Sequence, residues 1–268
     1  EETEGNGIRS HALSEEIIVT FSIHDSDSSV QSHFSECSET FLIEACFYAL
    51  INTKNTMTFV GKKFPSIVVN AMNEMGDPIQ INVLEEAVQN KKKIMLLWYP
   101  KDFTFVCPTE LHAFQEALPE FEKRNTIVIG ASCDTPEVHF AWLSTAKDNG
   151  GIEGITYNLL ADSNRNLSSI LGILDTTNVR IDEETGVELR DGDNVTYRAT
   201  YLIDEDGTVF HEGINHMPLG RNVQEYLRIV DAYAHFQVKG EVCPANWEEG
   251  KEAMDATRKG VAAYLSNN

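Results

Sequence analysis

The sequence has few cysteines, few basic residues and no long apolar run, and each shortage excludes a class of protein. Five cysteines are spread over 268 residues without a C-x-x-C pair. That pattern excludes a disulfide-stabilised scaffold and the common zinc sites, and it is typical of a reducing compartment. The longest apolar candidate, residues 41–51, is eleven residues long with a glutamate inside it. It is too short to span a membrane.

Basic residues are outnumbered two to one. The chain has 21 Lys and Arg against 42 Asp and Glu, a formal net charge of -21. Its one basic cluster, Lys91 to Lys93, is too short for a nucleic-acid footprint. A chain this acidic is repelled by phosphate backbones and anionic lipid surfaces. We therefore expect neither a nucleic acid nor a membrane among its partners.

The first 56 residues differ in composition from the rest. They are rich in Ser and Glu, with ten acidic and two basic side chains. An acidic stretch precedes the apolar residues 41–51, which is unlike a signal peptide. We predict a poorly ordered extension over 1–56, a domain over 57–236 and a C-terminal arm over 237–268. The predicted location is cytoplasmic, with an organellar address in 1–56 left open.

Strand and helix patterns alternate from residue 94 onward. Residues 94–99 and 126–132 are continuous apolar runs, typical of strands buried on both faces. The other expected elements are helices at 108–125 and 135–151, a strand and helix at 156–174, a hairpin at 195–214 and a closing helix at 221–236. Pro119 predicts a kink in the first of these helices. This alternation indicates an α/β domain with a central sheet.

Cys107, in the segment FTFVCPTE, lies between a predicted strand and a predicted helix. Pro108 suits the first helical turn, where its missing N–H breaks no hydrogen bond. Cys107 therefore falls at or near the helix N-terminus, where backbone N–H groups and the helix dipole favour a thiolate. The alternative interpretation is a small buried hydrophobic residue.

The neighbours of Cys107 favour a reactive thiol. Thr104 places a hydroxyl three residues before the sulfur, and Glu110 lies about one helical turn after it, where a carboxylate suits an arginine. Pro100 ends the strand and is expected to shield the thiol from water.

The segment YPKDFTFVCPTE resembles the active-site motif of the peroxiredoxins, Pro-x-x-x-Thr-x-x-Cys. The resemblance is closest to the typical two-cysteine group, which includes the alkyl hydroperoxide reductase small subunit, and it runs from about Met57 to the C-terminus. Further motifs match in the same order. They are HFAW with Trp142, YRATYLID with Arg198, PLGR with Arg221, and GEVCPANW with Cys243.

This resemblance implies a thioredoxin-like fold, with a central mixed β-sheet flanked by helices and a C-terminal arm. It implies that Cys107 is the peroxidatic cysteine, which a hydroperoxide oxidises to a sulfenic acid. The implied catalytic partners are Arg198, Thr104 and Pro100. The implied supporting residues are Glu110, Arg221 and Trp142. No cofactor and no metal are expected.

The resemblance also implies how the sulfenic acid is reduced. Cys243, the resolving cysteine, condenses with Cys107 of the partner subunit to give an intersubunit disulfide. A thioredoxin-type or flavoprotein disulfide reductase then recycles the enzyme by exchange. The implied assembly is a homodimer, and beyond it a ring of dimers.

Three departures from the family pattern stand out. Residues 150–153, Gly-Gly-Ile-Glu, and the tail Tyr264-Leu265 only half match two family elements, Gly-Gly-Leu-Gly and Tyr-Phe, that accompany sensitivity to over-oxidation. We therefore predict moderate resistance to over-oxidation. The loop at 182–194 is longer than usual and reads as an acidic surface hairpin.

Two other functions compete with a peroxidase. A disulfide oxidoreductase of the same fold is disfavoured by the missing C-x-x-C. A redox-regulated chaperone oligomer is the alternative from a different class. The remaining thiols and histidines are given lesser roles: a buried thiol for Cys133, a possible pairing of Cys37 with Cys46, and surface or packing positions for His112 and His139.

Overall fold

The computed structural model describes residues 58–176 and 179–267. The predictions made for residues 1–56, including any pairing of Cys37 with Cys46, lie outside this part of the chain. Within the described residues, no helix combines the length and the apolar character that crossing a bilayer requires.

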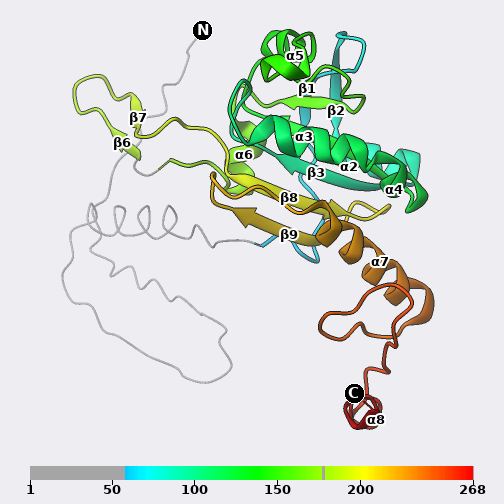
Figure 1. The fold of residues 1–268 in the computed structure, drawn as a ribbon. Coiled ribbons are helices and arrows are strands. Elements are labelled where there is room, and N and C mark those ends of the chain that lie inside the picture. The colour runs from blue at the N-terminus through cyan, green and yellow to red at the C-terminus, as the bar shows by residue number, and fades with distance from the viewer. Residues whose placement is uncertain (1–57, 177–178, 268) are drawn as a thin grey trace, which may run out of the picture. The chain divides into compact units, whose positions relative to one another are not determined.

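A seven-stranded mixed sheet forms the centre of the fold, in the order β2-β1-β5-β4-β3-β8-β9 (Figure 1). Strand β4 pairs in parallel with both of its neighbours, β3 and β5, and the other pairs are antiparallel. This confirms the predicted mixed sheet. The strands are β1 Val68–Met72, β2 Pro78–Asn82, β3 Lys93–Trp98, β4 Thr126–Ser132, β5 Leu159–Ala161, β8 Arg198–Ile203 and β9 Val209–Asn215.

Strand β3, in the interior of the sheet, is buried along its whole length, as its apolar run predicts. Successive side chains of a strand point to opposite faces of the sheet. Leu96 and Trp98 accordingly belong to one hydrophobic cluster. Met95 and Leu97 belong to a second cluster, which also contains Cys107. The candidate thiol is therefore packed against one face of the sheet.

The helices are α2 Val83–Asn90, α3 Cys107–Glu116, α4 Leu118–Lys123, α5 Pro136–Leu143, α6 Asn166–Leu171, α7 Val223–Lys239 and α8 Arg258–Asn267, with a 3-10 turn at Lys147–Asn149. All but α8, which lies apart at the C-terminus, pack near the sheet (Figure 1), and α3, α5 and α6 begin within one residue of their predicted starts. The helix predicted at 108–125 is divided at Ala117 into α3 and α4, two residues before Pro119. The predicted kink is thus a break between two helices.

The predicted bounds of two helices were wrong. Helix α5 ends at Leu143 instead of near residue 151, because the hydroxyls of Ser144 and Thr145 donate to carbonyls one turn back. The closing helix α7 begins two residues later than predicted and continues to Lys239, where Gly240 caps it in the left-handed conformation at φ 70°. The sequence patterns also did not predict β1, β2 or α2.

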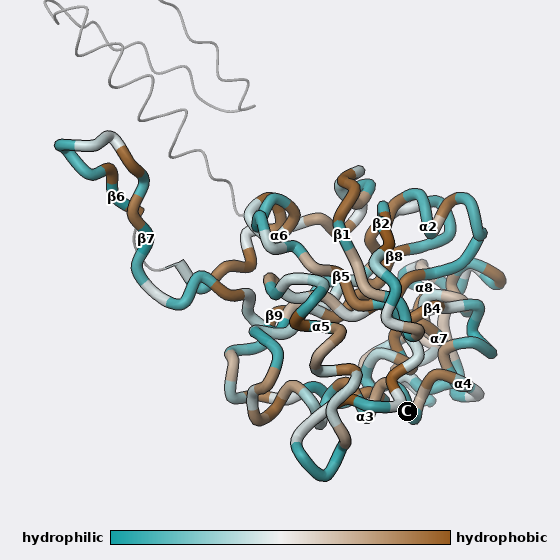
Figure 2. The backbone as a smooth tube through the Cα atoms, turned by 90° about the horizontal axis from the view of Figure 1, so that it is seen from above, coloured by the Kyte–Doolittle hydropathy of each residue, from teal (hydrophilic) through white to brown (hydrophobic). Residues whose placement is uncertain are grey.

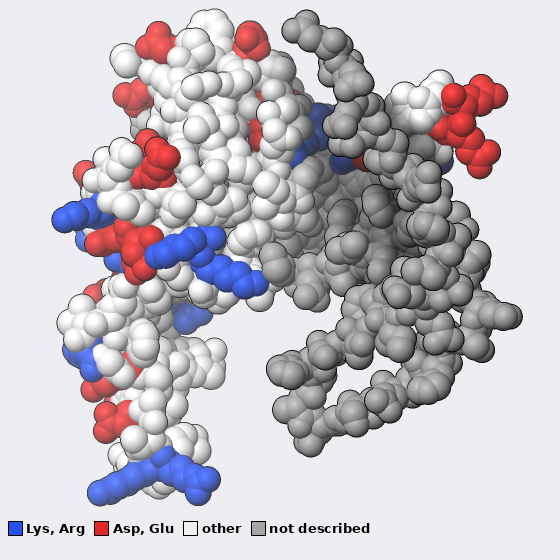
Figure 3. All heavy atoms as spheres, turned by 180° about the vertical axis from the view of Figure 1, so that it is seen from behind, with Lys and Arg blue, Asp and Glu red and all other residues white. Residues whose placement is uncertain are grey.

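The hairpin predicted at 182–194 is present as β6 Val179–Ile181 and β7 Glu188–Arg190. It extends away from the central sheet (Figure 2), and acidic side chains lie at its tip (Figure 3). At its base Lys101 pairs with Asp193 at 3.7 Å, with both side chains exposed.

The segment after α7 folds back on that helix. Val242 and Met254 form an isolated antiparallel bridge, and the buried Trp247 lies with its ring 4.9 Å from the ring of His235 on α7. The division of the chain into a domain ending at 236 and an arm from 237 stays a prediction, since helix α7 continues through that boundary.

Candidate active site

Cys107 is the first residue of α3, immediately after the N-cap Val106 and before Pro108. Strand β3 and the loop of residues 100–106 precede it in the chain. Cys107 is 0% exposed. Burial alone fits both interpretations of this thiol, the reactive and the structural. Its polar contact favours the reactive interpretation.

That contact is with Arg198, the first residue of β8. Its Nη1 donates to Cys107 Sγ at 3.3 Å and to Glu110 Oε2 at 2.7 Å. Its Nε donates to the carbonyl of Met217 at 2.6 Å. A guanidinium held by an acceptor on each side has little freedom. Its positive charge at this distance stabilises a thiolate more than a neutral thiol.

Glu110, one turn into α3, joins two buried arginines. Arg221 donates to it from its backbone N at 2.8 Å, from Nε at 2.9 Å and from Nη2 at 2.9 Å. Burial acts to raise the pKa of Glu110, but Arg221 and Arg198 outweigh it and hold that pKa below its usual range. The carboxylate is therefore charged at neutral pH and fixes both guanidinium groups.

The other predicted residues lie close to this cluster without hydrogen bonds to it. Pro100 is buried at the end of β3. Trp142 is buried in the same hydrophobic cluster as Cys107, and its Nε1 donates to the carbonyl of Gly150 at 3.0 Å. Thr104 is half-buried, and its hydroxyl donates to the carbonyl of Lys101 at 2.9 Å. In this conformation the hydroxyl of Thr104 is directed at its own loop.

Cys243 is not part of the cluster. It is half-buried, and its Sγ contacts the carbonyl of Ala232 on α7 at 3.5 Å. Burial raises the pKa of this thiol, and nearby Arg228 partly offsets the rise. Ala232 lies nine residues after the start of α7, so this contact is roughly 14 Å along the helix axis from that start. Within the described residues Cys107, Cys133 and Cys243 are all free thiols.

Cys133 agrees with the expected structural role. It is buried next to the hydroxyl of Ser168, with Sγ and Oγ 3.7 Å apart. Burial raises its pKa to about 11. At neutral pH this thiol is therefore protonated and a poor nucleophile.

The sequence analysis missed a buried polar network beneath the active-site loop. Asp102 accepts from the hydroxyl of Tyr99 at 2.9 Å and contacts His139 Nδ1 at 2.8 Å. His139 has the buried packing position that was expected, but its carboxylate partner was not. An aspartate within an aromatic loop, together with His139 three residues before Trp142, was the available signal.

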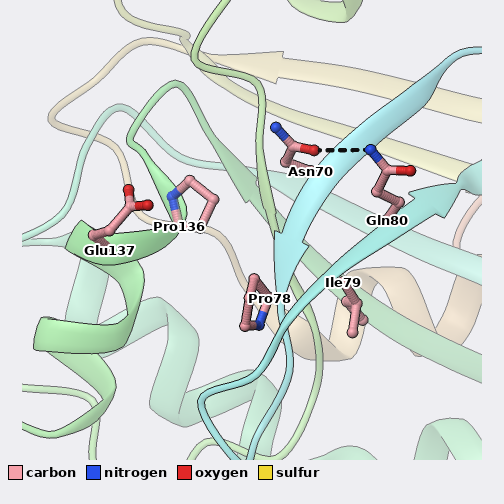
Figure 4. Close-up of a pocket in the computed structure, with 6 residues that line it drawn as sticks. All are labelled: Asn70, Pro78, Ile79, Gln80, Pro136 and Glu137. Atoms are coloured by element: carbon pink, nitrogen blue, oxygen red, sulfur yellow. Dashed lines mark hydrogen bonds between the residues drawn. The ribbon is translucent and has the colours of Figure 1, made fainter.

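A cavity of about 480 Å³ lies elsewhere on the molecule. Side chains of β1, β2 and α5 line it, and Asn70 hydrogen-bonds Gln80 at one side (Figure 4). None of its lining residues belongs to the cluster around Cys107. Among the described residues no group of His, Cys, Asp and Glu side chains is arranged to hold a metal ion.

Comparisons with known proteins identify the family of the chain. The model of the AhpC/TSA family matches residues 60–212. The chain belongs to this family. A second model, described as the C-terminal domain of 1-Cys peroxiredoxin, matches residues 234–267, which include Cys243.

Relatives of this peroxiredoxin carry two kinds of name. Alkyl hydroperoxide reductase C of Helicobacter pylori is 42% identical over 178 residues, 66% of this chain and 82% of the relative. The chloroplastic 2-Cys peroxiredoxin BAS1 of Hordeum vulgare is 34% identical over 82% of this chain and 96% of the relative. Both names indicate a peroxidase, and they confirm the family that the motifs predicted.

Solved structures show the same fold. The reduced 2-Cys peroxiredoxin of Plasmodium vivax has 38% sequence identity and a TM-score of 0.69, covering 78% of this chain and all of that one. The predicted thioredoxin-like α/β fold is therefore confirmed. The C-terminal model is named for one-cysteine enzymes, whereas the Hordeum vulgare and Plasmodium vivax proteins are named as two-cysteine enzymes. The part played by Cys243 consequently needs a direct test.

Proposed function

We propose that this chain is a thiol-dependent peroxidase whose nucleophile is Cys107. The observation that carries the proposal is the 3.3 Å contact between Arg198 Nη1 and Cys107 Sγ at the first residue of a helix. A fixed cation and a helix N-terminus at one sulfur favour a thiolate. The substrate class is hydrogen peroxide and organic hydroperoxides, and the names of the relatives support it.

In the first step the Cys107 thiolate attacks the terminal oxygen of the hydroperoxide. The S–O bond forms as the O–O bond breaks, and the departing alkoxide or hydroxide takes up a proton. Sulfur is oxidised to a sulfenic acid, and the peroxide is reduced to an alcohol or water. Arg198 stabilises the charge that develops on the departing oxygen, because its donors are already held in place by Glu110 and Met217. Pro100 limits access of water.

Thr104 needs a small rearrangement to take part. Its hydroxyl now donates to the carbonyl of Lys101, and a rotation of its side chain would free it to contact the peroxide. Positioning by this hydroxyl and by the backbone N–H of Cys107 would supply part of the rate. Trp142 and Arg221 act through packing and through Glu110, respectively.

In the second step the thiol of Cys243 attacks the sulfenic sulfur of Cys107 in a partner subunit. An S–S bond forms and water leaves. Cys107 is fully buried, so the first part of α3 must unwind before the two sulfurs can meet. A disulfide between subunits requires self-association as a homodimer, and a ring of dimers is the assembly that we propose beyond it. A dithiol reductase of the thioredoxin or flavoprotein type then reduces the disulfide.

A redox-regulated chaperone is the less favoured function, because the relatives are named as peroxidases and reductases. The cytoplasmic location stays a prediction, since the chloroplastic location of the Hordeum vulgare relative belongs to that protein alone. The predicted resistance to over-oxidation also stays a prediction.

Replacing Cys243 by serine tests the function and the resolving role together. With a thioredoxin-type reductant, the wild type should consume peroxide continuously and form a covalent dimer that appears on non-reducing gels. Cys243→Ser should react with the first equivalent of peroxide at the wild-type rate, because Cys107 is unaltered. It should then stop as a sulfenic acid, which a sulfenic-acid-specific reagent and mass spectrometry would detect.

Two results would change this assignment. If the wild type did not consume peroxide with any dithiol reductant, the peroxidase function would be wrong. Continuous turnover by Cys243→Ser, with its sulfenic acid reduced directly by the added thiol, would instead identify a one-cysteine enzyme.

A further inference from the structure

The loop between β3 and Cys107 has one buried polar side chain among exposed neighbours. Phe103 is 54% exposed, Phe105 is 94% exposed, and Lys101 is exposed as well, whereas Asp102 is only 4% exposed. A buried carboxylate is unfavourable unless hydrogen bonds compensate it. Asp102 is therefore the point at which this loop is anchored to the interior.

Three different elements hold that anchor. Tyr99, directly after β3, donates its hydroxyl to Oδ1 of Asp102 at 2.9 Å. His139 on α5, with 0% of its side chain exposed, contacts Oδ2 through Nδ1 at 2.8 Å. Asp134, after β4, accepts from the backbone N–H of Asp102 at 2.8 Å. The loop is thus fixed to the sheet and to α5 at a single residue.

The hydrogen bond of the second ring nitrogen of His139 determines which protonation states the pair of His139 and Asp102 can adopt. Nε2 lies 3.0 Å from the carbonyl of Leu160, which can only accept, so Nε2 carries a hydrogen. The contact between Nδ1 and Asp102 then needs one further hydrogen, held by either partner. The pair is a charged imidazolium with a carboxylate or a neutral histidine with a carboxylic acid. In both forms the net charge of the pair is zero, which suits two fully buried side chains.

The backbone beside the anchor is strained. Phe103 has φ 53°, in the left-handed region that residues with a Cβ atom rarely adopt. Its ring lies 5.8 Å from that of Trp142, one turn after His139 on α5. Strain of this kind persists only where surrounding contacts determine the conformation. Here His139 and Trp142, on one helix, contact two adjacent residues of the loop.

We propose that Asp102 and His139 form a positioning pair that holds the loop of residues 100–106 in the conformation from which Cys107 reacts with hydroperoxide. The inference rests on the proposed peroxidase function. The pair touches neither the sulfur nor the site of the peroxide. It acts through the loop, which carries Thr104 and ends at Cys107.

The pair should affect the two chemical steps differently. Reaction with peroxide needs the loop in place, because Cys107 must lie beside Arg198. Disulfide formation needs the start of α3 to unwind, so a loosened loop does not slow it. Releasing the loop should therefore slow formation of the sulfenic acid and leave disulfide formation equal or faster. A variant that only lost stability would not slow the first step while leaving the second unchanged or faster.

Two substitutions at His139 separate the loop contact from packing. The amide nitrogen of asparagine replaces Nδ1 and keeps a donor for Asp102, whereas that of glutamine replaces Nε2 and keeps the donor for Leu160. Each variant loses one hydrogen bond and the imidazole ring. Their melting temperatures should fall by similar amounts.

Only glutamine releases the loop. We expect His139→Gln to slow oxidation of Cys107 by about tenfold or more, the loss expected for one hydrogen bond to a charged group, and His139→Asn to stay within about threefold of wild type. The measurement is rapid-quench alkylation of reduced protein after mixing with peroxide. Leu143→Ala, also on α5, removes packing without removing any loop hydrogen bond and serves as the stability control.

The shared hydrogen gives the pair a pH dependence. Burial acts to lower the pKa of His139, but Asp102 outweighs it and raises that pKa above its usual value. Burial raises the pKa of Asp102, which His139 partly offsets. The other groups that face the pair are Asp134 and Tyr99, whose own pKa is raised well above its usual value, mainly by burial. The contact is therefore intact near neutrality and is lost as pH rises through the raised pKa of His139.

Asp102→Asn removes this dependence and keeps the geometry. Its amide donates to the unprotonated Nδ1 of His139, and its oxygen accepts from Tyr99. The wild-type oxidation rate should decline at alkaline pH, as the pH rises through the raised pKa of His139, whereas the rate of Asp102→Asn should not. Near neutrality Asp102→Asn should stay within about threefold of wild type, and Asp102→Ala should resemble His139→Gln.

The outcomes separate this inference from the peroxidase function. If wild-type Cys107 does not react with peroxide, the function itself fails. If the wild type reacts but His139→Gln, His139→Asn and Leu143→Ala slow oxidation in proportion to their loss of stability, the positioning pair is overturned. The proposal would also be overturned if the oxidation rates of the wild type and of Asp102→Asn declined equally at alkaline pH.

Discussion

Cys107→Ser is expected to remove turnover completely while leaving the protein folded. In the presence of a thioredoxin-type reductant, peroxide consumption should fall to the rate of the reductant alone. A serine hydroxyl does not ionise near neutral pH and so cannot act as the nucleophile in this setting. Arg198 can still donate to the serine oxygen, so the buried guanidinium keeps a partner. The stability change should therefore be about 1 kcal/mol or less.

The matched control is Cys133→Ser. Cys133 is also buried, but its contact is with Ser168, and its raised pKa keeps it protonated. We expect this variant to retain wild-type turnover with a small loss of stability. A chaperone would protect client proteins from aggregation equally well with serine at 107. Undiminished peroxide turnover by Cys107→Ser would contradict the proposed nucleophile.

Glu110→Ala is expected to cause the largest loss of stability of the substitutions considered. Arg198 and Arg221 are 4% and 9% exposed, and both donate to this one carboxylate. Removing one partner of a buried ion pair costs about 3–5 kcal/mol, because it leaves charge buried without compensation. For a domain of this size each kcal/mol lowers the melting temperature by about 2–4 °C. A fall of roughly 6–20 °C is therefore expected in a thermal unfolding scan.

Activity should fall as well, because Arg198 loses one of the two acceptors that orient it and keeps only the carbonyl of Met217. We expect oxidation of Cys107 to slow on the order of a hundredfold in Glu110→Ala, in line with the loss of a preorganised donor. Glu120→Gln provides the control, since Glu120 pairs with Lys123 and Arg124 on the surface. That variant should unfold at close to the wild-type temperature, because exposed ion pairs contribute little to stability. Normal stability and activity in Glu110→Ala would contradict the role given to this carboxylate.

The contribution of Glu110 to stability also has a predictable pH dependence. Its pKa is lowered in the folded state, so its stabilisation is present above the unfolded-state pKa and is lost as pH falls through the folded one. The difference in unfolding free energy between wild type and Glu110→Gln should therefore shrink in acid. Denaturant titrations at neutral and acidic pH would measure it.

The apolar runs and the motif around Cys107 were sufficient to predict the centre of the fold. Strand β4 occupies the predicted residues, because a continuous apolar run bounded by polar residues has one plausible conformation in a sheet buried on both faces. The strands β1 and β2 escaped prediction. They pair at the end of the sheet and each strand is only partly buried, so polar residues interrupt their sequences and no long apolar run marks them.

The site was predictable only as far as its motifs extend. Cys107, Arg198, Glu110 and Arg221 meet as the resemblance implied, although the arginines lie about ninety residues or more from the cysteine. The pairing of Asp102 with His139 could not be read in the same way. It joins a loop to a helix 37 residues later, and only the folded sheet brings the two together. The shorter α5 depended on local competition by Ser144 and Thr145, which helical spacing does not reveal.

The interruption at Ala117 separates the helix that begins at Cys107 from the one that holds Phe121 in the core. Each redox cycle can then open a short segment and reclose it without disturbing α4 or β4. Amide hydrogen exchange should display this as two cooperative units, with fast-exchanging amides in the first turns of α3 and strong protection beyond the interruption. The rest of the domain would thus stay folded while the first turns of α3 unfold and refold at every turnover.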